Sequence, residues 1–287
     1  MKREKHLPQY LKRGLINTEK TKTVRRILKE KCLNTVCEEA RCPNKAECYS
    51  KDTATFMIMG DTCTRNCRFC NINSGFPKPL DIDEPKHVAQ AVKELKLNYA
   101  VITSVTRDDL TDGGSEHFSQ TILEIKNLAP NTKVEVLIPD FKGNFKALET
   151  VLKANPDVLN HNVETVPSLY KKVRPQAIYE RSLAILKYSK EFSTMTKTGI
   201  MVGLGETKHD LIKLFEDLKS IDLDILTIGQ YIRPSKKHIE VEKYYTPKEF
   251  DDLRELAKSI GIKIVISSPL VRSSFKAFEA YKNILKL

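Results

Sequence analysis

The chain has 287 residues, of which 40% are hydrophobic and 30% are charged, and its formal net charge is +11. This composition excludes an intrinsically disordered chain, and the length allows one large α/β domain with a sizeable core. No apolar run approaches the roughly 20 residues of a membrane-spanning helix, and the charged residues 1–6 lack the apolar stretch of a secretory signal. We therefore expect no membrane segment.

Positive charge is concentrated near the start of the sequence. Residues 1–50 contain thirteen Lys or Arg and six Glu, a net charge of +7. A basic surface of this kind favours an acidic partner, either nucleic acid or protein. Aromatic side chains are not interleaved with the basic ones as base stacking requires, so we predict an acidic protein partner and no nucleic acid. General solubility is the competing explanation for the total charge.

The predicted elements begin with an extended arm, residues 1–50, that contains a short helix near 24–31. From residue 54 onward, short apolar β-rich runs alternate with amphipathic helical patterns. This alternation predicts a parallel sheet with right-handed crossovers, and six units fit a partial (βα)6 barrel of the TIM type better than an eightfold one. The predicted strands are 54–59, 99–105, 133–138, 158–163, 197–203 and 225–231, with 263–266 as a further candidate.

Three regions follow from this pattern: the arm 1–50, a barrel domain 51–270, and a tail 271–287. Within the barrel, Thr246 followed by Pro247 and Glu249 predicts a helix start with a capping box. Thr207 and Asp210 offer a similar cap for the preceding helix.

All seven cysteines lie between residues 32 and 70. Cys63, Cys67 and Cys70 form a Cys-x3-Cys-x2-Cys loop after the first predicted strand, at the end where barrel enzymes carry catalytic groups. Fully ligated ferredoxin-type clusters take four cysteines, so three thiolates would leave one iron open to a substrate or cofactor. Structural zinc needs four closed ligands, and disulfide frameworks belong to small secreted chains. We therefore favour an open iron–sulfur cluster over both.

A second triad, Cys37, Cys42 and Cys48, has the spacing Cys-x4-Cys-x5-Cys. Two triads predict two clusters, each without a fourth cysteine. Cys32 is left over, and we interpret it as an incidental thiol. Unpaired thiols and oxygen-sensitive clusters indicate the cytoplasm, the alternative being an organelle if a transit peptide has been removed.

Polar residues cluster at the ends of the later predicted strands. Thr106 follows the second strand, and Asn162 and Glu164 follow the fourth, with Arg174 shortly beyond. Glu164 and Arg174 could contact a ligand or could form an ion pair with each other, and we leave both interpretations open. The fifth strand ends in the glycine-rich segment 199–206, which allows close backbone approach.

A hydrolase is the other enzyme class that the sequence raises. His117, His161 and Asp109 could be imagined as a catalytic triad. The chain has no Gly-x-Ser-x-Gly nucleophile elbow, and these residues lie on different strand–helix units. We therefore interpret the histidines as structural or ligand-contacting groups.

The Cys63 loop, with Phe69 before its last cysteine, resembles the radical S-adenosylmethionine (SAM) superfamily. Segment 199–206 fits the Gly-x-Ile-x-Gly-x-x-Glu pattern of that superfamily, with Met201 at the Ile position. The second triad and the Arg-Ser-Ser-Phe segment 272–275 make the resemblance more specific: they resemble motifs of the lipoyl synthase family. This resemblance extends over nearly all of residues 32–278. Three residues depart from the family pattern: Tyr10 stands for Trp, Gln176 for Gly, and Phe275 for Tyr.

This resemblance implies two [4Fe-4S] clusters and SAM as cofactors. The Cys63/Cys67/Cys70 cluster would bind SAM. The triad that begins at Cys37, with Ser274 as fourth ligand, would hold an auxiliary cluster. The residues implied to lie near SAM are Phe69, Thr106, Asn162, Glu164, Arg174 and Met201.

The resemblance also implies a sulfurtransferase activity. A 5′-deoxyadenosyl radical from SAM would abstract hydrogen from C6 and C8 of an octanoyl chain on a carrier lysine, and the auxiliary cluster would supply two sulfur atoms to give N6-lipoyl-lysine. The arm and tail should then fold over the barrel mouth. The implied partners are octanoylated lipoyl domains of 2-oxoacid dehydrogenase E2, the glycine-cleavage H protein, an electron donor such as ferredoxin or flavodoxin, and iron–sulfur carrier proteins.

Two other classes compete with this interpretation. A different radical SAM enzyme would keep the first triad but would not need the second triad together with Ser274. A metal-stabilised nucleic-acid binder would explain the charge and the cysteines, but it would not need polar, glycine-punctuated strand ends.

Overall fold

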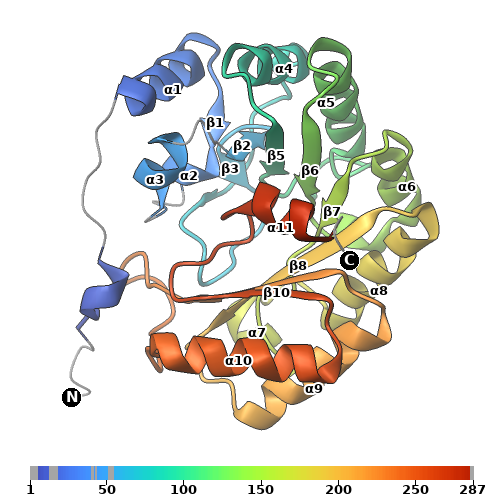
Figure 1. Ribbon diagram of the computed structural model, residues 1–287. Coiled ribbons are helices and arrows are strands. Elements are labelled where there is room, and N and C mark those ends of the chain that lie inside the picture. The colour runs from blue at the N-terminus through green and yellow to red at the C-terminus, as the bar shows by residue number, and fades with distance from the viewer. Residues whose placement is uncertain (1–5, 13–18, 40–41, 43, 51–54, 285–287) are drawn as a thin grey trace.

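The computed structural model describes residues 6–12, 19–39, 42, 44–50 and 55–284. An eight-stranded sheet forms its centre (Figure 1). The strands, in their order across the sheet, are β1 (Asn34–Thr35), β2 (Thr55–Ile58), β5 (Tyr99–Ser104), β6 (Lys133–Leu137), β7 (Val158–Asn160), β8 (Met195–Val202), β9 (Ile225–Gln230) and β10 (Ile264–Ser267).

The sheet is an open barrel rather than a closed one. Each neighbouring pair from β2 to β10 is parallel, and β1 pairs antiparallel with β2. No pairing joins the edge strands β1 and β10 within the described ranges. The expected partial barrel is confirmed, and the candidate strand at 263–266 is its seventh parallel strand. A separate small pair, β3 (Thr62–Cys63) with β4 (Asn73–Ser74), flanks the first cysteine loop.

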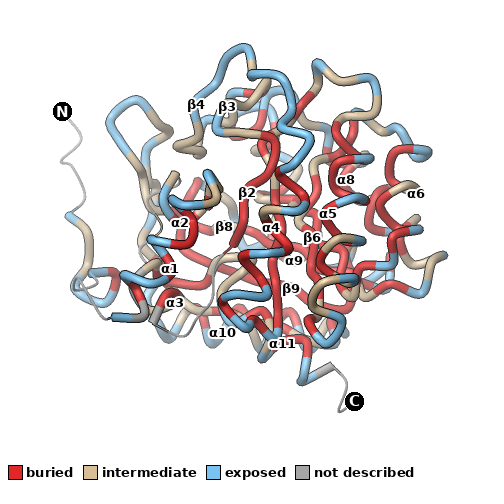
Figure 2. The backbone as a smooth tube through the Cα atoms, turned by 90° about the horizontal axis from the view of Figure 1, so that it is seen from above, coloured by how far each residue is buried: buried red, intermediate tan, exposed pale blue. Residues whose placement is uncertain are grey.

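Helices cover the outer, convex face of the sheet (Figures 1 and 2). Each helix packs an apolar stripe inward. In the helix Glu84–Glu94, for example, Val88, Ala91 and Val92 are fully buried. The helices between parallel strands are α4 (Glu84–Glu94), α5 (Ser115–Leu128), α6 (Phe145–Lys153), α8 (Tyr179–Ser189), α9 (Lys208–Ser220) and α10 (Pro247–Ile260). Short connecting turns are η1 (Gln9–Leu11), η2 (Phe141–Gly143), η3 (Pro167–Leu169), α7 (Tyr170–Val173) and η4 (Lys190–Phe192). Among the described residues, no helix is long and apolar enough to cross a bilayer.

Both predicted helix caps are confirmed as capping boxes. At the start of α9, Thr207 Oγ1 accepts a hydrogen bond from the backbone N–H of Asp210, and the backbone N–H of Thr207 donates one to the carboxylate of Asp210. Thr246 and Glu249 make the same exchange at the start of α10. The direction of both helices is therefore set locally, and each leads away from the carboxyl end of a strand.

The arm folds onto the barrel through three helices: α1 (Glu19–Glu30), α2 (Val36–Glu39) and α3 (Lys45–Ser50). The first helix begins five residues before the predicted 24, because its opening turn is polar and gave no apolar signal. Val24, Ile27 and Tyr49 are buried in the same core as Phe56 of β2. The arm therefore shares the core of the barrel instead of extending from it.

The segment after β10 enters the concave interior of the barrel. Helix α11 (Ala277–Ile284) packs its Ala277 and Tyr281 against Tyr99, Val101 and Val158. These partners lie near the amino ends of β5 and β7, so the end of the described chain fills the barrel from the side opposite its mouth. We expected the whole tail to lie over the mouth of the barrel, but only its residues before α11 do so.

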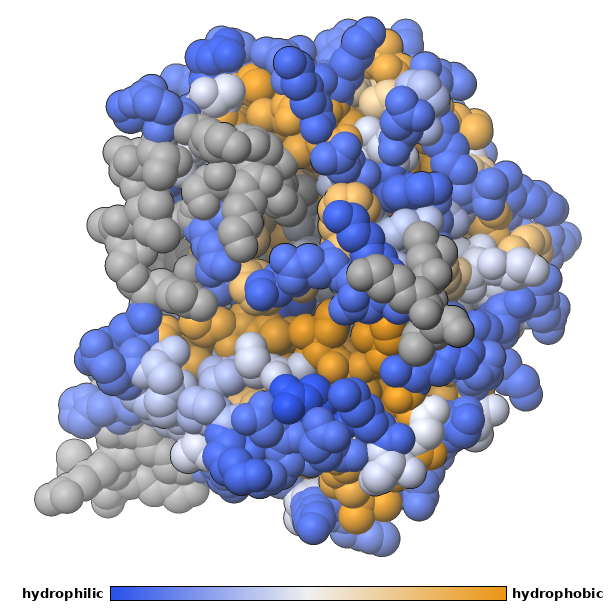
Figure 3. All heavy atoms as spheres, in the orientation of Figure 1, coloured by the Kyte–Doolittle hydropathy of each residue, from blue (hydrophilic) through white to orange (hydrophobic). Residues whose placement is uncertain are grey.

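The interior of the barrel also contains a buried ion pair. Lys197 Nζ lies 2.9 Å from Glu135 Oε1, and both side chains are at most 1% exposed. Tyr99 and Asn160 donate hydrogen bonds to the same carboxylate at 2.6 and 3.0 Å. The outer surface differs: the face seen in Figure 3 is largely hydrophilic, with a band of apolar side chains across its middle.

Candidate functional site

A cavity of about 500 Å³ opens at the carboxyl ends of the strands. Its wall contains residues from the arm, the barrel and the segment after β10. Every predicted cluster ligand and every predicted SAM-contact residue lies on this wall. The cysteines and serines that line it are Cys37, Cys42, Cys48, Cys63, Cys67, Cys70, Ser273 and Ser274. Three segments that are far apart in the sequence therefore meet around one space.

The first cysteine loop begins at β3, and its first thiol lies among backbone N–H groups. The Sγ of Cys63 accepts hydrogen bonds from the backbone N–H of Arg65 at 3.4 Å and of Thr106 at 3.3 Å. Thr64 Oγ1 donates to the carbonyl of Thr106 at 2.9 Å and accepts from the N–H of Asp108. The loop after β5 is thus joined to the start of the cysteine loop, and Thr106 contributes a main-chain donor to sulfur.

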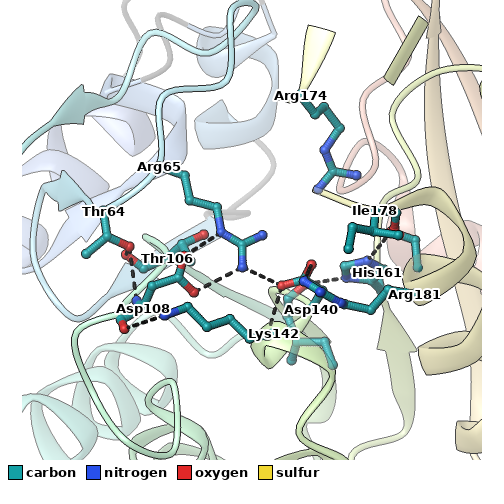
Figure 4. Close-up of polar contacts among 12 residues, drawn as sticks. Thr64, Arg65, Thr106, Asp108, Asp140, Lys142, His161, Arg174, Ile178 and Arg181 are labelled. Atoms are coloured by element: carbon teal, nitrogen blue, oxygen red, sulfur yellow. Dashed lines mark hydrogen bonds and ion pairs between the residues drawn. The ribbon is translucent and has the colours of Figure 1, made fainter. Parts of the chain in front are cut away.

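Arg65, within the loop, makes the most extensive buried contacts (Figure 4). Its Nε and Nη2 donate to the two carboxylate oxygens of Asp108 at 2.7 and 3.0 Å. Its Nη2 also donates to Asp140 at 2.5 Å, and Arg181 contacts the other oxygen of Asp140 at 3.2 Å. Although burial opposes ionisation, the guanidinium of Arg65 holds the pKa of Asp140 well below its usual range. No motif in the sequence pointed to this network.

The second half of the loop is held by two other connections of the barrel mouth. The backbone N–H of Arg68 donates to the carbonyl of Val173 at 3.0 Å, at the end of α7. His238, in the loop after β9, contacts the carbonyl of Cys70 through Nε2 at 2.9 Å. The backbone N–H of Ile239 donates to Arg68 O at 3.1 Å. The loop that carries the three thiols is therefore bonded to loops that follow four different strands, β5, β6, β7 and β9.

Asn162, Glu164 and Arg174 lie together on the cavity wall. Arg174 Nη1 donates to the carbonyl of Asn162 at 2.8 Å, and Asn162 Nδ2 donates to Glu164 Oε1 at 3.0 Å. No ion pair joins Glu164 to Arg174 in the described part of the chain, so that alternative is not what the structure contains. Asn162 Oδ1 and Arg174 Nε are buried and have no hydrogen-bond partner among the described residues. Such atoms are available to a polar ligand.

Glu164 has unusual backbone and electrostatic properties. Its φ angle is +66°, a left-handed conformation that costs energy for a residue with a side chain. Burial raises the pKa of its carboxyl, while the nearby Arg174 opposes that shift. Its carbonyl accepts a hydrogen bond from the backbone N–H of Met201 at 2.8 Å. A strained, partly buried carboxylate at a strand end is typical of a functional position.

Phe69 and Met201 form an apolar part of the wall. They pack in one cluster with Val173, Leu204 and Tyr231. Phe69 comes from the cysteine loop and Met201 from the end of β8, so this cluster joins the loop to the glycine-rich segment. Both residues line the same cavity as the polar group of Asn162, Glu164 and Arg174.

The second triad comes from the arm and contacts the segment after β10. Cys37 is on α2, Cys48 is on α3, and Cys42 lies between these helices. The side chain of Asn44 donates to the carbonyl of Leu270 at 2.6 Å. No sequence pattern pointed to this buried asparagine, which links the arm to the segment after β10.

Two glycines let the segment after β10 approach the sheet. A β-carbon on Gly229 would collide with the carbonyl of Val271, and one on Gly199 would lie 3.3 Å from Ser273 Cβ. Ser273 Oγ lies 3.3 Å from Asn162 Nδ2, whereas Ser274 faces the cavity without that bond. The pair of serines therefore has two different environments, which the sequence alone did not distinguish.

The chemistry of the two triads fits iron–sulfur clusters. Burial raises the pKa of Cys37 and of Cys70 to about 12, so these thiols stay protonated at neutral pH unless a metal ion replaces their protons. Within the described ranges, no three Cys, His, Asp or Glu side chains surround one point as a single metal ion requires. A [4Fe-4S] cluster needs a wider arrangement, because each thiolate binds a different iron.

The imagined hydrolase triad is not assembled. His117 Nε2 contacts Glu84 at 2.7 Å, and Asp109 pairs with Arg107 at 2.7 Å. His161 is held between the carbonyl of Ile138 at 2.9 Å and a serine hydroxyl at 3.0 Å. Both histidines are hydrogen-bonded within the fold, and His161 also lines the cavity.

Sequence comparison is consistent with this geometry. The sequence model of the family described as "Radical SAM superfamily" matches residues 57–218. Lipoyl synthase from Caldanaerobacter subterraneus subsp. tengcongensis is 55% identical over 272 residues, which cover 94% of this chain and 95% of the relative. Lipoyl synthase from Aquifex aeolicus is 54% identical over 268 residues, with 93% and 97% coverage.

Solved structures agree on the fold alone. The crystal structure of methylornithine synthase superposes with a TM-score of 0.57 at 15% identity and covers 91% of this chain and 85% of its own. Streptococcus suis SuiB bound to S-adenosylmethionine gives a TM-score of 0.57 at 12% identity, with 78% and 54% coverage. Both likenesses extend over most of this chain, so the partial barrel is a shared architecture.

Proposed function

Because this chain belongs to the lipoyl synthase family within the radical SAM superfamily, we propose a separate task for each of its cysteine triads. The enzyme inserts two sulfur atoms, at C6 and C8, into a protein-bound N6-octanoyl-lysine, and its cofactors are two [4Fe-4S] clusters and SAM. Cys63, Cys67 and Cys70 would hold the cluster that binds SAM. Together these cofactors supply a radical able to abstract hydrogen from an alkyl carbon, which no acid–base side chain can do.

The remaining cluster would be held by the arm and the tail. Cys37, Cys42 and Cys48 would each bind one iron, and Ser274 would bind the fourth. A hydroxyl oxygen is a weaker ligand for iron than a thiolate, so Ser274 would release its iron more readily when sulfur is withdrawn. We thus assign residues 1–50 and 271–287 to sulfur supply and residues 51–270 to radical formation.

Several cavity residues would orient SAM. The unpartnered Nε of Arg174 could pair with the carboxylate of SAM, and Glu164 could accept from a ribose hydroxyl. Asn162 would contribute its unpartnered Oδ1. Thr106 would keep its N–H on Cys63 Sγ, while Phe69 and Met201 would pack against the ligand. The unsatisfied buried atoms of Asn162 and Arg174 are the main support for this arrangement.

The cavity also suits an acyl chain. Apolar side chains line the same cavity as the two triads, among them Val36, Ile72, Leu137 and Ile138. An octanoyl chain placed there would bring C6 and C8 within reach of both triads. It would also exclude water from the reacting carbons. The single observation that carries the proposal is that both triads line one cavity.

We also propose the partners and the location of the enzyme from its membership of the lipoyl synthase family. The enzyme acts on lipoyl-carrier proteins; we propose that these are the lipoyl domains of 2-oxoacid dehydrogenase E2 and the glycine-cleavage H protein. The net charge of +7 in residues 1–50 supports an acidic carrier. We further propose a ferredoxin or flavodoxin as electron donor, iron–sulfur carrier proteins for cluster delivery, and a cytoplasmic location, which the seven free thiols support.

The decisive experiment uses anaerobically reconstituted protein whose iron and sulfide have been quantified. It is incubated with SAM, a reductant and an octanoyl-lysine peptide, and the peptide is analysed by mass spectrometry. We expect a product that carries two sulfur atoms. If protein that demonstrably holds both clusters gave no such product, the assignment of this activity to the chain would be refuted.

A further inference from the structure

Arg65 lies between the first two cysteines of the cluster loop, yet it does not line the cavity. Its side chain is 5% exposed. It bridges Asp108, which follows β5, and Asp140, which follows β6 (Figure 4). One side chain of the loop is therefore bonded to two neighbouring strand ends behind the cavity wall.

The charges around Arg65 are balanced. Arg65 and Arg181 supply two positive charges, and Asp108 and Asp140 supply two negative ones. Arg65→Lys would leave all four charges in place, so the effect of the guanidinium geometry can be tested apart from the effect of charge. The planar guanidinium matches two carboxylates at once, which a lysine ammonium cannot do.

The geometry matters at the sulfur of Cys63. That atom accepts hydrogen bonds from the backbone N–H groups of Arg65 and Thr106. One of these donors belongs to Arg65 itself, and the other belongs to the loop that contains Asp108. Hydrogen bonds to the sulfurs of an iron–sulfur cluster influence its reduction potential, because they stabilise the more negative, reduced state.

We propose that Arg65 is a positioning residue for the radical-generating cluster: by bridging Asp108 and Asp140 it keeps two N–H groups on Cys63 Sγ and thereby raises the reduction potential of that cluster. The inference rests on the assignment of Cys63, Cys67 and Cys70 as cluster ligands. It concerns a residue that touches neither SAM nor the acyl chain.

The first test is Arg65→Lys, which keeps the charge and removes the planar fork. Redox titration of the full-length holoenzyme, followed by electron paramagnetic resonance, should monitor the signal that changes when SAM is added. We expect the midpoint potential to become more negative while the iron content stays at the wild-type value. With a fixed reductant, SAM cleavage should slow in proportion to the fall in the reduced fraction of the cluster, which is tenfold for a shift of about 59 mV in a one-electron couple.

The second test separates position from charge. Asp108→Asn weakens the same bridge but removes a negative charge, so a field effect would raise the midpoint potential and a positioning effect would lower it. We expect the potential to fall. Asp109→Asn is the matched control, because Asp109 loses the same charge on the next residue but is paired with Arg107. This control should keep the wild-type potential.

A wild-type midpoint in Arg65→Lys, or a raised midpoint in Asp108→Asn, would overturn the proposal. If Arg65→Lys does not fold, Asp108→Asn decides alone, since its side chain is 20% exposed and its loss is better tolerated. Failure of the underlying ligand assignment would look different, because wild-type protein would then give no SAM-sensitive signal at all.

Discussion

The carbonyl oxygen of Val271 occupies the space in which a β-carbon on residue 229 would have to lie. Gly229, on β9, therefore allows the segment that carries Ser274 to lie directly on the sheet. This contact connects the packing of the barrel interior to the proposed fourth ligand of the auxiliary cluster.

Gly229→Ala should displace that segment. Because a misplacement of about 1 Å in a reacting group can cost on the order of 100-fold in rate, formation of the dithiolated peptide should fall by that order. SAM cleavage, which depends on the other triad, should stay near the wild-type rate. Gly75→Ala is the control: its β-carbon would meet only Thr62, at an ordinary 3.5 Å. Full product formation by Gly229→Ala would contradict the expectation.

The two triads should lose iron independently. Cys70→Ala should lower the iron content from about eight to about four per chain and abolish SAM cleavage, since each [4Fe-4S] cluster contains four irons. Cys48→Ala should lower the iron content equally but leave SAM cleavage intact. Cys32→Ala, which removes the thiol outside both triads, should retain all iron. The measurements are iron quantification and detection of 5′-deoxyadenosine; loss of all iron in either triad variant would argue against two separate sites.

The adjacent serines should differ in importance. Ser274→Ala should abolish dithiolation while SAM is still cleaved, because the auxiliary cluster would lose its fourth protein ligand. Ser273→Ala removes only the hydrogen bond from Asn162, worth about 1 kcal/mol, so it should retain most of the activity. Mass spectrometry of the octanoyl-lysine peptide compares the two variants. Equal loss of product in both would show that Ser274 has no special role.

The buried ion pair in the barrel interior should be important for stability. Lys197→Met leaves the carboxylate of Glu135 buried without its cation, which should cost about 3–5 kcal/mol and lower the unfolding temperature by on the order of 10 °C. Lys133→Met is the matched control, because Lys133 is 45% exposed where it pairs with Asp157. An exposed pair contributes about 0–1 kcal/mol. Thermal unfolding that showed equal shifts for both variants would be inconsistent with this account.

Lowering the pH should reduce the free energy of unfolding, because the imidazole of His161 is buried in its neutral form. Burial lowers the pKa of His161 to about 4 in the folded chain, against about 6.5 when unfolded. Between these values the unfolded chain binds more protons, so stability falls as pH decreases, by about 2 kcal/mol from pH 7 to pH 5. His161→Gln should remove this part of the pH dependence. Unfolding temperatures of both proteins at several pH values test it, and parallel pH profiles would exclude His161 as the cause.

The strands could be predicted from the sequence because parallel strands are buried on both faces. Continuous apolar runs such as 99–105 stand out for that reason, and β5 covers Tyr99–Ser104. The two-residue strand β1 could not be found in this way, since it is too short to have a pattern. The position of α11 inside the barrel depends on contacts with Tyr99 and Val158, which its own sequence does not reveal.

The site was predictable where its residues form a motif with fixed spacing. Both cysteine triads and Ser274 are of this kind, and the structure brings them to one cavity. Arg65 and Asn44 were missed, because their partners Asp140 and Leu270 are far away in the sequence. A side chain whose role depends on a distant partner leaves no local signal.

The hydrogen bond from Asn44 to Leu270 has a consequence for the order of events during folding. It closes a loop of 226 residues, so its entropic cost is offset only after the intervening strands are in place. We therefore expect an intermediate in which the barrel has formed and the segment that carries Ser274 is still undocked. In that intermediate the part of the cavity wall that this segment forms is missing, which gives iron and sulfide a more open route to the cysteines of the arm.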